Sequence, residues 1–202
     1  MRQTSSADSL LLLSGGLDSS AVAALSRPEL CLFVDYGQRS AASEFRSAAA
    51  IADYLSIPIR SFSLDLSGLG SGTLVGVKPL PIAPTEEWFP YRNLFLASVG
   101  ASMALQTGQT EVMLGLVAED GERHLDGTPL FLEQLDTLIS MQEGSISVSA
   151  PFLDQPAASV IKASGLPQNL IQRTHSCHKS DLACGCCAGC AKRRVVLAKI
   201  GS

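Results

Sequence analysis

Short apolar runs alternate with helical patterns along most of this chain, and that alternation restricts its fold more than any other feature. Leu10–Leu13 is a purely apolar run, which suits a strand buried on both faces of a parallel sheet. Further strands are predicted at Glu29–Asp35, Ile59–Leu64 and Glu111–Leu116, and helices at Ser20–Leu25, Ser43–Leu55, Asn93–Leu105 and Pro129–Met141. This order predicts an α/β fold with a doubly wound parallel sheet.

Two further local patterns concern the connections. Thr128 and Pro129 have the residue types preferred at the N-cap and first position of a helix. Asp65–Pro90 is rich in Gly, Ser and Pro and is long for a connection inside a compact domain, which predicts a functional lid or mobile loop rather than a linker. With 202 residues the chain fits one main domain, predicted at 1–170, with a smaller C-terminal segment at 171–202 packed on it.

Charge and hydropathy exclude several classes of partner. The net charge of −4 argues against a broad basic surface for nucleic acid, so a small-molecule substrate is the better expectation. The four leucines Leu10–Leu13 are too few for the apolar region of a signal peptide or for a membrane span. We therefore expect a cytoplasmic protein without a membrane partner.

The segment "SGGLDSS" (Ser14–Ser20) follows the first predicted strand at the carboxyl end of the sheet, where open α/β folds bind ligands. Gly15 and Gly16 allow a tight turn whose amides point at an anion, and the serines add hydroxyl donors. The next helix directs its positive end to the same point. A serine-capped turn without a ligand is the alternative, but the full pattern favours a phosphate site.

Asp18 distinguishes this loop from the usual nucleotide P-loop, which carries a lysine. A carboxylate beside phosphates would repel them unless a divalent cation lay between the two groups. The loop therefore predicts Mg²⁺ together with the phosphates.

Five of the six cysteines lie within residues 177–190. In a reducing compartment such a cluster more often binds metal than forms disulfides. Cys31 lies inside an apolar strand and is most simply a core thiol.

Four motifs together resemble a known family. "SGGLDSS" is the signature of the PP-loop ATP pyrophosphatases, which have an adenine nucleotide alpha hydrolase-like fold. "DYGQRS" (Asp35–Ser40) resembles the Asp-Tyr-Gly-Gln-Arg-His of 7-cyano-7-deazaguanine synthases, and "PYRN" (Pro90–Asn93) resembles their Pro-Gly-Arg-Asn. Cys177 with "CGCCAGCAKR" (Cys184–Arg193) resembles their Cys-Gly-x-Cys-x-x-Cys-x-x-Arg. The chain is thus similar to this family over nearly its whole length.

The resemblance implies a set of metal ligands. Four thiolates would hold one structural Zn²⁺, and with every position filled by protein no water could be activated. The implied ligands are Cys177, Cys184, Cys187 and Cys190. Cys186 falls at a variable position of the motif, and His175 and His178 are not needed. The basic run Lys192–Arg194 leaves three interpretations open: a nucleic-acid grip, a helix beside an anionic site, or a solvated turn.

The resemblance also implies a reaction. The carboxylate of 7-carboxy-7-deazaguanine would be adenylated by ATP with Mg²⁺, pyrophosphate would leave, and ammonia would form an amide that a second ATP converts to the nitrile. Asp18 would hold the metal, and Arg39 or Arg92 would pair with an anionic oxygen. Arg92 is the better candidate, because it lies next to Asn93 at a predicted helix start after the long connection. The implied ATP-binding residues are Leu13, Ser14, Gly15, Gly16, Leu17, Asp18, Ser19 and Ser20. The implied substrate-binding residues are Tyr36, Gln38, Arg39, Arg92, Asn93, Asp120 and Asp126. The family also implies a homodimer.

Departures from the family pattern concentrate in Val117–Phe131, "VAEDGERHLDGTPLF". His124-Leu125 stands where the family has Tyr-Pro, and Gly127-Thr128 where it has Cys-Arg. Ser40 replaces a histidine, and a family lysine expected after "APFLDQP" is not evident. Three hypotheses follow: the family reaction itself, a related enzyme joining the activated carboxylate to another amine such as a protein, or a nucleotide-binding, zinc-stapled interaction module without turnover.

Overall fold

The computed structural model describes residues 8–201, so the outer ends of the two predicted segments, residues 1–7 and 202, lie outside the described residues. The described residues form a five-stranded parallel sheet with the spatial order β3-β2-β1-β4-β5. Its strands are β1 (Ser9–Leu12), β2 (Leu30–Asp35), β3 (Ile59–Ser63), β4 (Glu111–Met113) and β5 (Ser147–Ser149).

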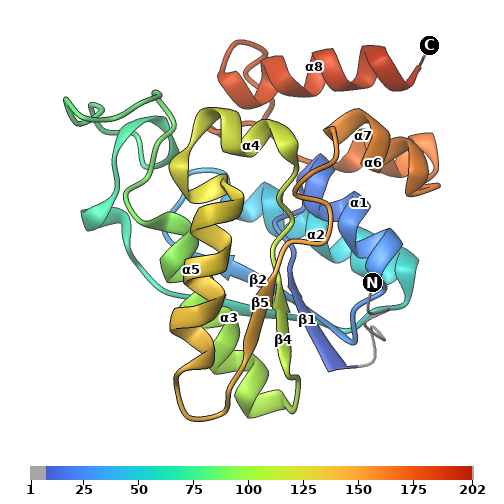
Figure 1. The fold of residues 1–202 in the computed structure, drawn as a ribbon. Coiled ribbons are helices and arrows are strands. Elements are labelled where there is room, and N and C mark those ends of the chain that lie inside the picture. The colour runs from blue at the N-terminus through green and yellow to red at the C-terminus, as the bar shows by residue number, and fades with distance from the viewer. Residues whose placement is uncertain (1–7, 202) are drawn as a thin grey trace.

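Helices cover both faces of the sheet, so the predicted doubly wound architecture is confirmed (Figure 1). One face packs against α1 (Leu17–Ser26), α2 (Ala41–Leu55), α6 (Ala157–Ala163) and α7 (Gln168–Arg173). The other packs against α3 (Arg92–Thr107) and α5 (Pro129–Ser140). α4 (Ala118–Arg123) and α8 (Ala188–Ile200) lie at the end of the sheet where the strands stop. Within residues 8–201 no helix is both long and apolar enough to span a bilayer.

The central strand β1 explains why its sequence is uniformly apolar. Leu11 packs into the core beneath α1 and α2, whereas Leu10 packs into the core beneath α3 and α5. Both side chains are fully buried. A strand with a helical layer on each face needs apolar residues at successive positions rather than at alternate ones.

The eight predicted helices and strands are all present, with ends shifted by a few residues. α1 begins at Leu17, three residues before the predicted start, and β4 ends at Met113, three residues before its predicted end. The predicted cap of α5 is confirmed, because the Phe131 amide donates to Thr128 Oγ1 at 3.3 Å. α4, β5, α6 and α7 were not predicted from the sequence.

The long connection 65–90 is fastened to the end of β2. Leu74 and Phe89 are buried against Tyr36, with the two aromatic rings edge to face at a centroid distance of 5.3 Å. The Arg39 amide donates to the Leu74 carbonyl at 2.8 Å. The connection therefore forms one wall above the sheet, and its role as a lid stays a prediction.

The C-terminal segment is hydrogen-bonded directly to α2 and to the loop Ser14–Ser20, which we call the glycine-rich loop. The His175 amide donates to the Gly15 carbonyl at 2.9 Å, and the Ser47 hydroxyl donates to the Arg173 carbonyl at 2.8 Å. Residues 171–201 thus help to position the loop after β1. A domain boundary at residue 170 stays a prediction.

We predict that Gly15→Ala lowers the melting temperature more than Gly165→Ala. Both glycines have positive φ, +76° and +64°, a region that costs a non-glycine residue about 1–3 kcal/mol. A Cβ on Gly15 would also lie 2.4 Å from the Glu44 carbonyl oxygen, whereas a Cβ on Gly165 meets nothing within 4 Å. Thermal unfolding followed by circular dichroism measures both effects, and equal losses would contradict the steric argument.

Candidate active site

A cavity of about 290 Å³ opens at the carboxyl ends of β1 and β4. β2 and β4 flank β1, and the chain leaves these neighbouring strands toward opposite faces of the sheet. Such a point is where open α/β sheets bind their ligands. The lining comes from the loop after β1, the start of α3, the segment after β4 and the C-terminal segment.

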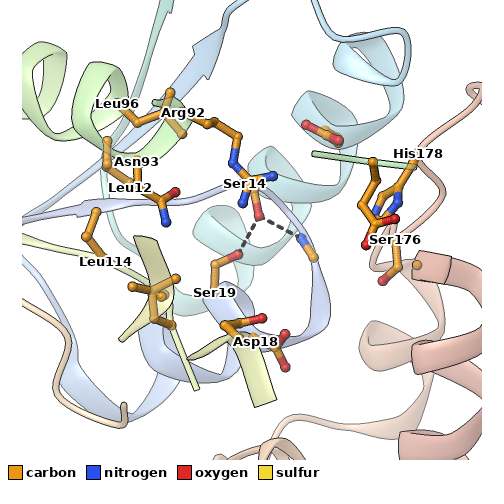
Figure 2. A pocket seen from close by; sticks show the side chains of 18 of the residues that line it. Leu12, Ser14, Asp18, Ser19, Arg92, Asn93, Leu96, Leu114, Ser176 and His178 are labelled. Atoms are coloured by element: carbon orange, nitrogen blue, oxygen red, sulfur yellow. Dashed lines mark hydrogen bonds between the residues drawn. The ribbon is translucent and has the colours of Figure 1, made fainter. Parts of the chain in front are cut away.

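The glycine-rich loop forms the floor of the cavity (Figure 2). The Ser14 and Ser19 hydroxyls lie 2.9 Å apart, and the Gly16 amide donates to Ser14 Oγ at 3.3 Å. Of the predicted ATP-binding residues, the cavity is lined by Leu13, Ser14, Gly16, Leu17, Asp18 and Ser19. Gly15 and Ser20 support the loop from behind, since the Ser20 hydroxyl donates to the Gly16 carbonyl at 2.6 Å.

The start of α1 directs backbone donors at this floor. Gly16 is the N-cap and no side chain caps the helix. The Ser20 amide donates to the Gly16 carbonyl at 3.2 Å, and the amides before it in the first turn have no acceptor within the helix. An anion at this position would receive those hydrogen bonds and the favourable end of the helix dipole.

Asp18 shares a lysine with Asp120. Lys192 Nζ, from α8, lies 2.9 Å from Asp18 Oδ2 and 3.1 Å from Asp120 Oδ1. The other Asp18 oxygen, Oδ1, is buried and has no hydrogen-bond partner among the described residues. Burial raises the pKa of the Asp18 carboxyl, and Lys192 opposes that shift. Burial disfavours the Lys192 ammonium, but the two carboxylates raise its pKa to about 12.

Arg92 and Asn93 begin α3 and line the opposite side, with Arg92 directed into the cavity (Figure 2). Burial opposes the charge of Arg92, but Tyr36 and the carboxylates of Asp126 and Asp120 raise its pKa above the ordinary value. Asn93 Nδ2 donates to the Asp126 carbonyl at 2.8 Å, which ties the start of α3 to the turn 125–127. Arg92 is therefore a fixed cation facing the glycine-rich loop.

The predicted residues of the "DYGQRS" motif separate into two groups. Tyr36 and Gln38 line the cavity, and Gln38 is held in place by the Tyr36 amide at 2.8 Å and by Glu44 Oε2 at 2.9 Å. Arg39 is exposed, is not among the cavity-lining residues and lies against Gly76. Of the two arginines considered as a charge partner, the structure places Arg92, not Arg39, at the cavity.

Glu44 is a partly buried cavity residue that was not predicted from the sequence. Ser40, where the family has a histidine, donates its hydroxyl to Glu44 Oε1 at 2.7 Å. Burial raises the pKa of this carboxyl, and the bonds from Gln38 and Ser40 oppose the shift. The two bonds fix the carboxylate beside the turn after β2.

The altered segment 117–131 forms a second wall together with the 65–90 connection. Arg123 forms an ion pair with Glu87, and His124 Nε2 lies 3.8 Å from the same Glu87 oxygen. Burial and the positive charge of Arg92 lower the pKa of His124, which favours a neutral imidazole. Gly127 packs tightly on α4, because a Cβ there would lie 2.8 Å from the Asp120 carbonyl carbon.

Four cysteines meet beside the cavity. Their sulfur atoms all lie within 4.8 Å of one another, and the set is Cys177, Cys184, Cys187 and Cys190. Amides also point at the sulfurs, with those of Lys179 and Cys184 each 3.5 Å from Cys177 Sγ. Such donors stabilise thiolates, so the donor set and spacing fit one tetrahedral Zn²⁺. Cys186, His175 and His178 stay outside this set.

The basic run after the cysteines belongs to a helix beside an anionic site. Lys192 and Arg193 line the cavity. Arg193 also donates to the Ile171 carbonyl at 3.0 Å and so caps the end of α7. Arg194 is exposed and donates to the Gly185 carbonyl. Of the three interpretations of this run, the geometry favours the helix beside an anionic site.

The sheet order and the glycine-rich loop after its central strand define an α/β protein of the PP-loop nucleotide-binding class. The family described as "Queuosine biosynthesis protein QueC" matches residues 8–201. The chain therefore belongs to the QueC family.

Three relatives that align with most of this chain are all named 7-cyano-7-deazaguanine synthases. A 7-cyano-7-deazaguanine synthase of Methanothermobacter thermautotrophicus is 31% identical, covering 91% of this chain and 90% of its own. The 7-cyano-7-deazaguanine synthase 1 of Desulfitobacterium hafniense is 30% identical, covering 91% and 88%. A 7-cyano-7-deazaguanine synthase of Nitrosospira multiformis is 31% identical, covering 92% and 88%.

Metal analysis should find about one zinc ion per chain, because four thiolates accept one ion. Cys177→Ser should lose zinc and lower the melting temperature, since the free energy of metal binding contributes to folding. Cys186→Ser should change neither quantity, because Cys186 lies outside the set of four. Freshly purified protein without zinc would reject the site.

Proposed function

We propose that this chain is an ATP-dependent carbon–nitrogen ligase that activates the carboxylate of 7-carboxy-7-deazaguanine. The observation that carries the proposal is the glycine-rich loop at the carboxyl end of β1, which lines one cavity together with Arg92. The shared name of the relatives supplies the substrate class. ATP with Mg²⁺ and a deazapurine carboxylate would be the substrates.

In the first step a carboxylate oxygen would attack the α-phosphorus of ATP, and pyrophosphate would leave. The α1 amides, Ser14 and Ser19 would bind the departing phosphates, and Asp18 would hold Mg²⁺ through its unpartnered oxygen. Arg92 would neutralise the attacking carboxylate and orient it. The product is an acyl adenylate, which is a mixed anhydride.

In the second step an amine nitrogen would attack the acyl carbon, and AMP would leave. With ammonia the product is the amide. Its oxygen could attack the α-phosphorus of a second ATP with loss of pyrophosphate, and AMP and the N–H protons would then be lost to give the nitrile. The cavity wall formed by His124, Arg123 and Glu87 would determine which amine reaches the adenylate.

The altered segment favours a second candidate, in which the nucleophile is an amine larger than ammonia, such as one on a protein. Leu125 is 86% exposed and immediately precedes Asp126, and Tyr91 is 71% exposed and lies two residues before Asn93, which donates to the Asp126 carbonyl. Two exposed apolar side chains beside the cavity suit contact with a partner. The tight packing of Gly127 on α4 shows that losing a side chain there does not by itself open the wall.

Mass spectrometry of a reaction with ATP, Mg²⁺, 7-carboxy-7-deazaguanine and an ammonium salt tests these candidates. We expect AMP, pyrophosphate and either the amide or the nitrile. Nitrile as the main product would reject the second candidate, whereas a deazaguanine-sized increment on a co-expressed protein would support it. Nucleotide binding without any pyrophosphate release would favour the interaction module without turnover.

Asp18→Asn should reduce Mg²⁺-dependent pyrophosphate release by roughly a hundredfold or more, as expected for loss of an electrostatic group at the reacting phosphates. The melting temperature should change little, because the amide keeps the shape of the carboxylate. Asp53→Asn, on the exposed side of α2, is the matched control. Wild-type protein that released ADP and phosphate instead would reject adenylation.

A further inference from the structure

A basic side chain from the C-terminal helix reaches the glycine-rich loop. The Lys192 ammonium contacts both Asp18 and Asp120, at 2.9 and 3.1 Å. The lysine side chain is 26% exposed, and the two aspartates are 20% and 26% exposed. This three-residue contact, which we call the lysine bridge, is thus largely shielded from solvent.

The lysine bridge places a positive charge beside the glycine-rich loop, which has no basic residue of its own. Residues 14–20 contain no lysine or arginine. Among the cavity-lining residues that the structure describes, Lys192 is the sole lysine. It stands at an unspecified position of the Cys-x-x-Arg motif, so the motif gives it no role.

Charge balance explains why a cation is needed there. Two carboxylates close to one point repel each other and would repel an incoming triphosphate. The single positive charge of Lys192 contacts both carboxylates and offsets part of their repulsion. The second Asp18 oxygen is buried without a hydrogen-bond partner in the described part of the chain, so the pair is not fully satisfied by the lysine alone.

We infer that Lys192 is a phosphate-binding lysine of the nucleotide site, held by Asp18 and Asp120 until ATP and Mg²⁺ arrive. Asp18 would then hold the metal, and the Lys192 ammonium would bind a phosphate oxygen. This exchange rests on the proposed function, because it requires ATP in the cavity. No covalent bond changes in it.

The four cysteines fix the point from which this side chain extends. Cys187 is the N-cap of α8 and Cys190 lies on its first turn, two residues before Lys192. The Gly15–His175 hydrogen bond at 2.9 Å joins the same segment to the loop. The cysteine cluster and the nucleotide loop are therefore coupled through α8.

Calorimetry on the full-length zinc-containing protein tests the exchange with the variants Lys192→Met and Lys192→Arg. With a non-hydrolysable ATP analogue and Mg²⁺, Lys192→Met should bind about ten- to a hundredfold more weakly, as for a lost charge-assisted hydrogen bond. With Mg²⁺ alone the same variant should bind more tightly, because both carboxylates are released. Lys192→Arg should retain most of the analogue affinity. Lys199→Met, at an exposed position of the same helix, is the control.

Opposite changes in the two affinities separate this role from a purely structural one. Wild-type analogue affinity in Lys192→Met, or a loss of both affinities, would overturn the inference. If the methionine variant does not fold, Asp120→Asn gives the second test: it should tighten analogue binding by releasing the lysine, and unchanged or weaker binding would overturn the inference. Wild-type protein that bound no analogue would reject the proposed function as well.

Discussion

The parallel pairing of β1 with both of its neighbours is the constraint on which the candidate site depends. β1 pairs with β2 through Leu10–Leu12 and with β4 through Ser9–Leu11, so helical layers bury both of its faces. Because both faces of β1 are covered, the chain must turn where β1 ends, at the edge of the sheet between the two helical layers. Gly15 makes that turn with its Cα packed against the α2 backbone, where a Cβ would clash. The proposed phosphate site lies at this turn.

Most of the fold could be predicted because its large elements carry strong patterns. The run Leu10–Leu13 and the helix Pro129–Met141 were located within one residue at each end, since burial on both faces and a capped start leave clear residue choices. β5 was missed because three residues, Ser147–Ser149, are too few to show a pattern, and only Val148 of them is buried. α6 and α7 are short, and each follows a proline rather than a side-chain cap.

The candidate site could be predicted where a motif lies on one continuous segment. The loop residues and the four cysteines are such cases, and the structure gathers each set at one place. Arg92 could be preferred over Arg39 from its place beside Asn93 at a helix start, and the structure places Arg92 at the cavity and leaves Arg39 exposed. The contact of Lys192 with Asp18 joins residues 174 positions apart, and no local pattern encodes such a pair.

Several charged side chains that line the cavity are paired with one another. This pairing bears on how the cavity could bind a nucleotide. Lys192 is paired with Asp18 and Asp120, and Arg123 with Glu87. Arg92 faces the carboxylates of Asp126 and Asp120, which raise its pKa. Since a buried unpaired charge is costly, a site that binds a triphosphate and a carboxylate, as proposed here, would need internal counter-ions in the absence of its substrates. Under the proposed function, Asp18 would hold Mg²⁺ while Lys192 and Arg92 would pair with substrate anions, so binding would exchange the partners of these charged groups.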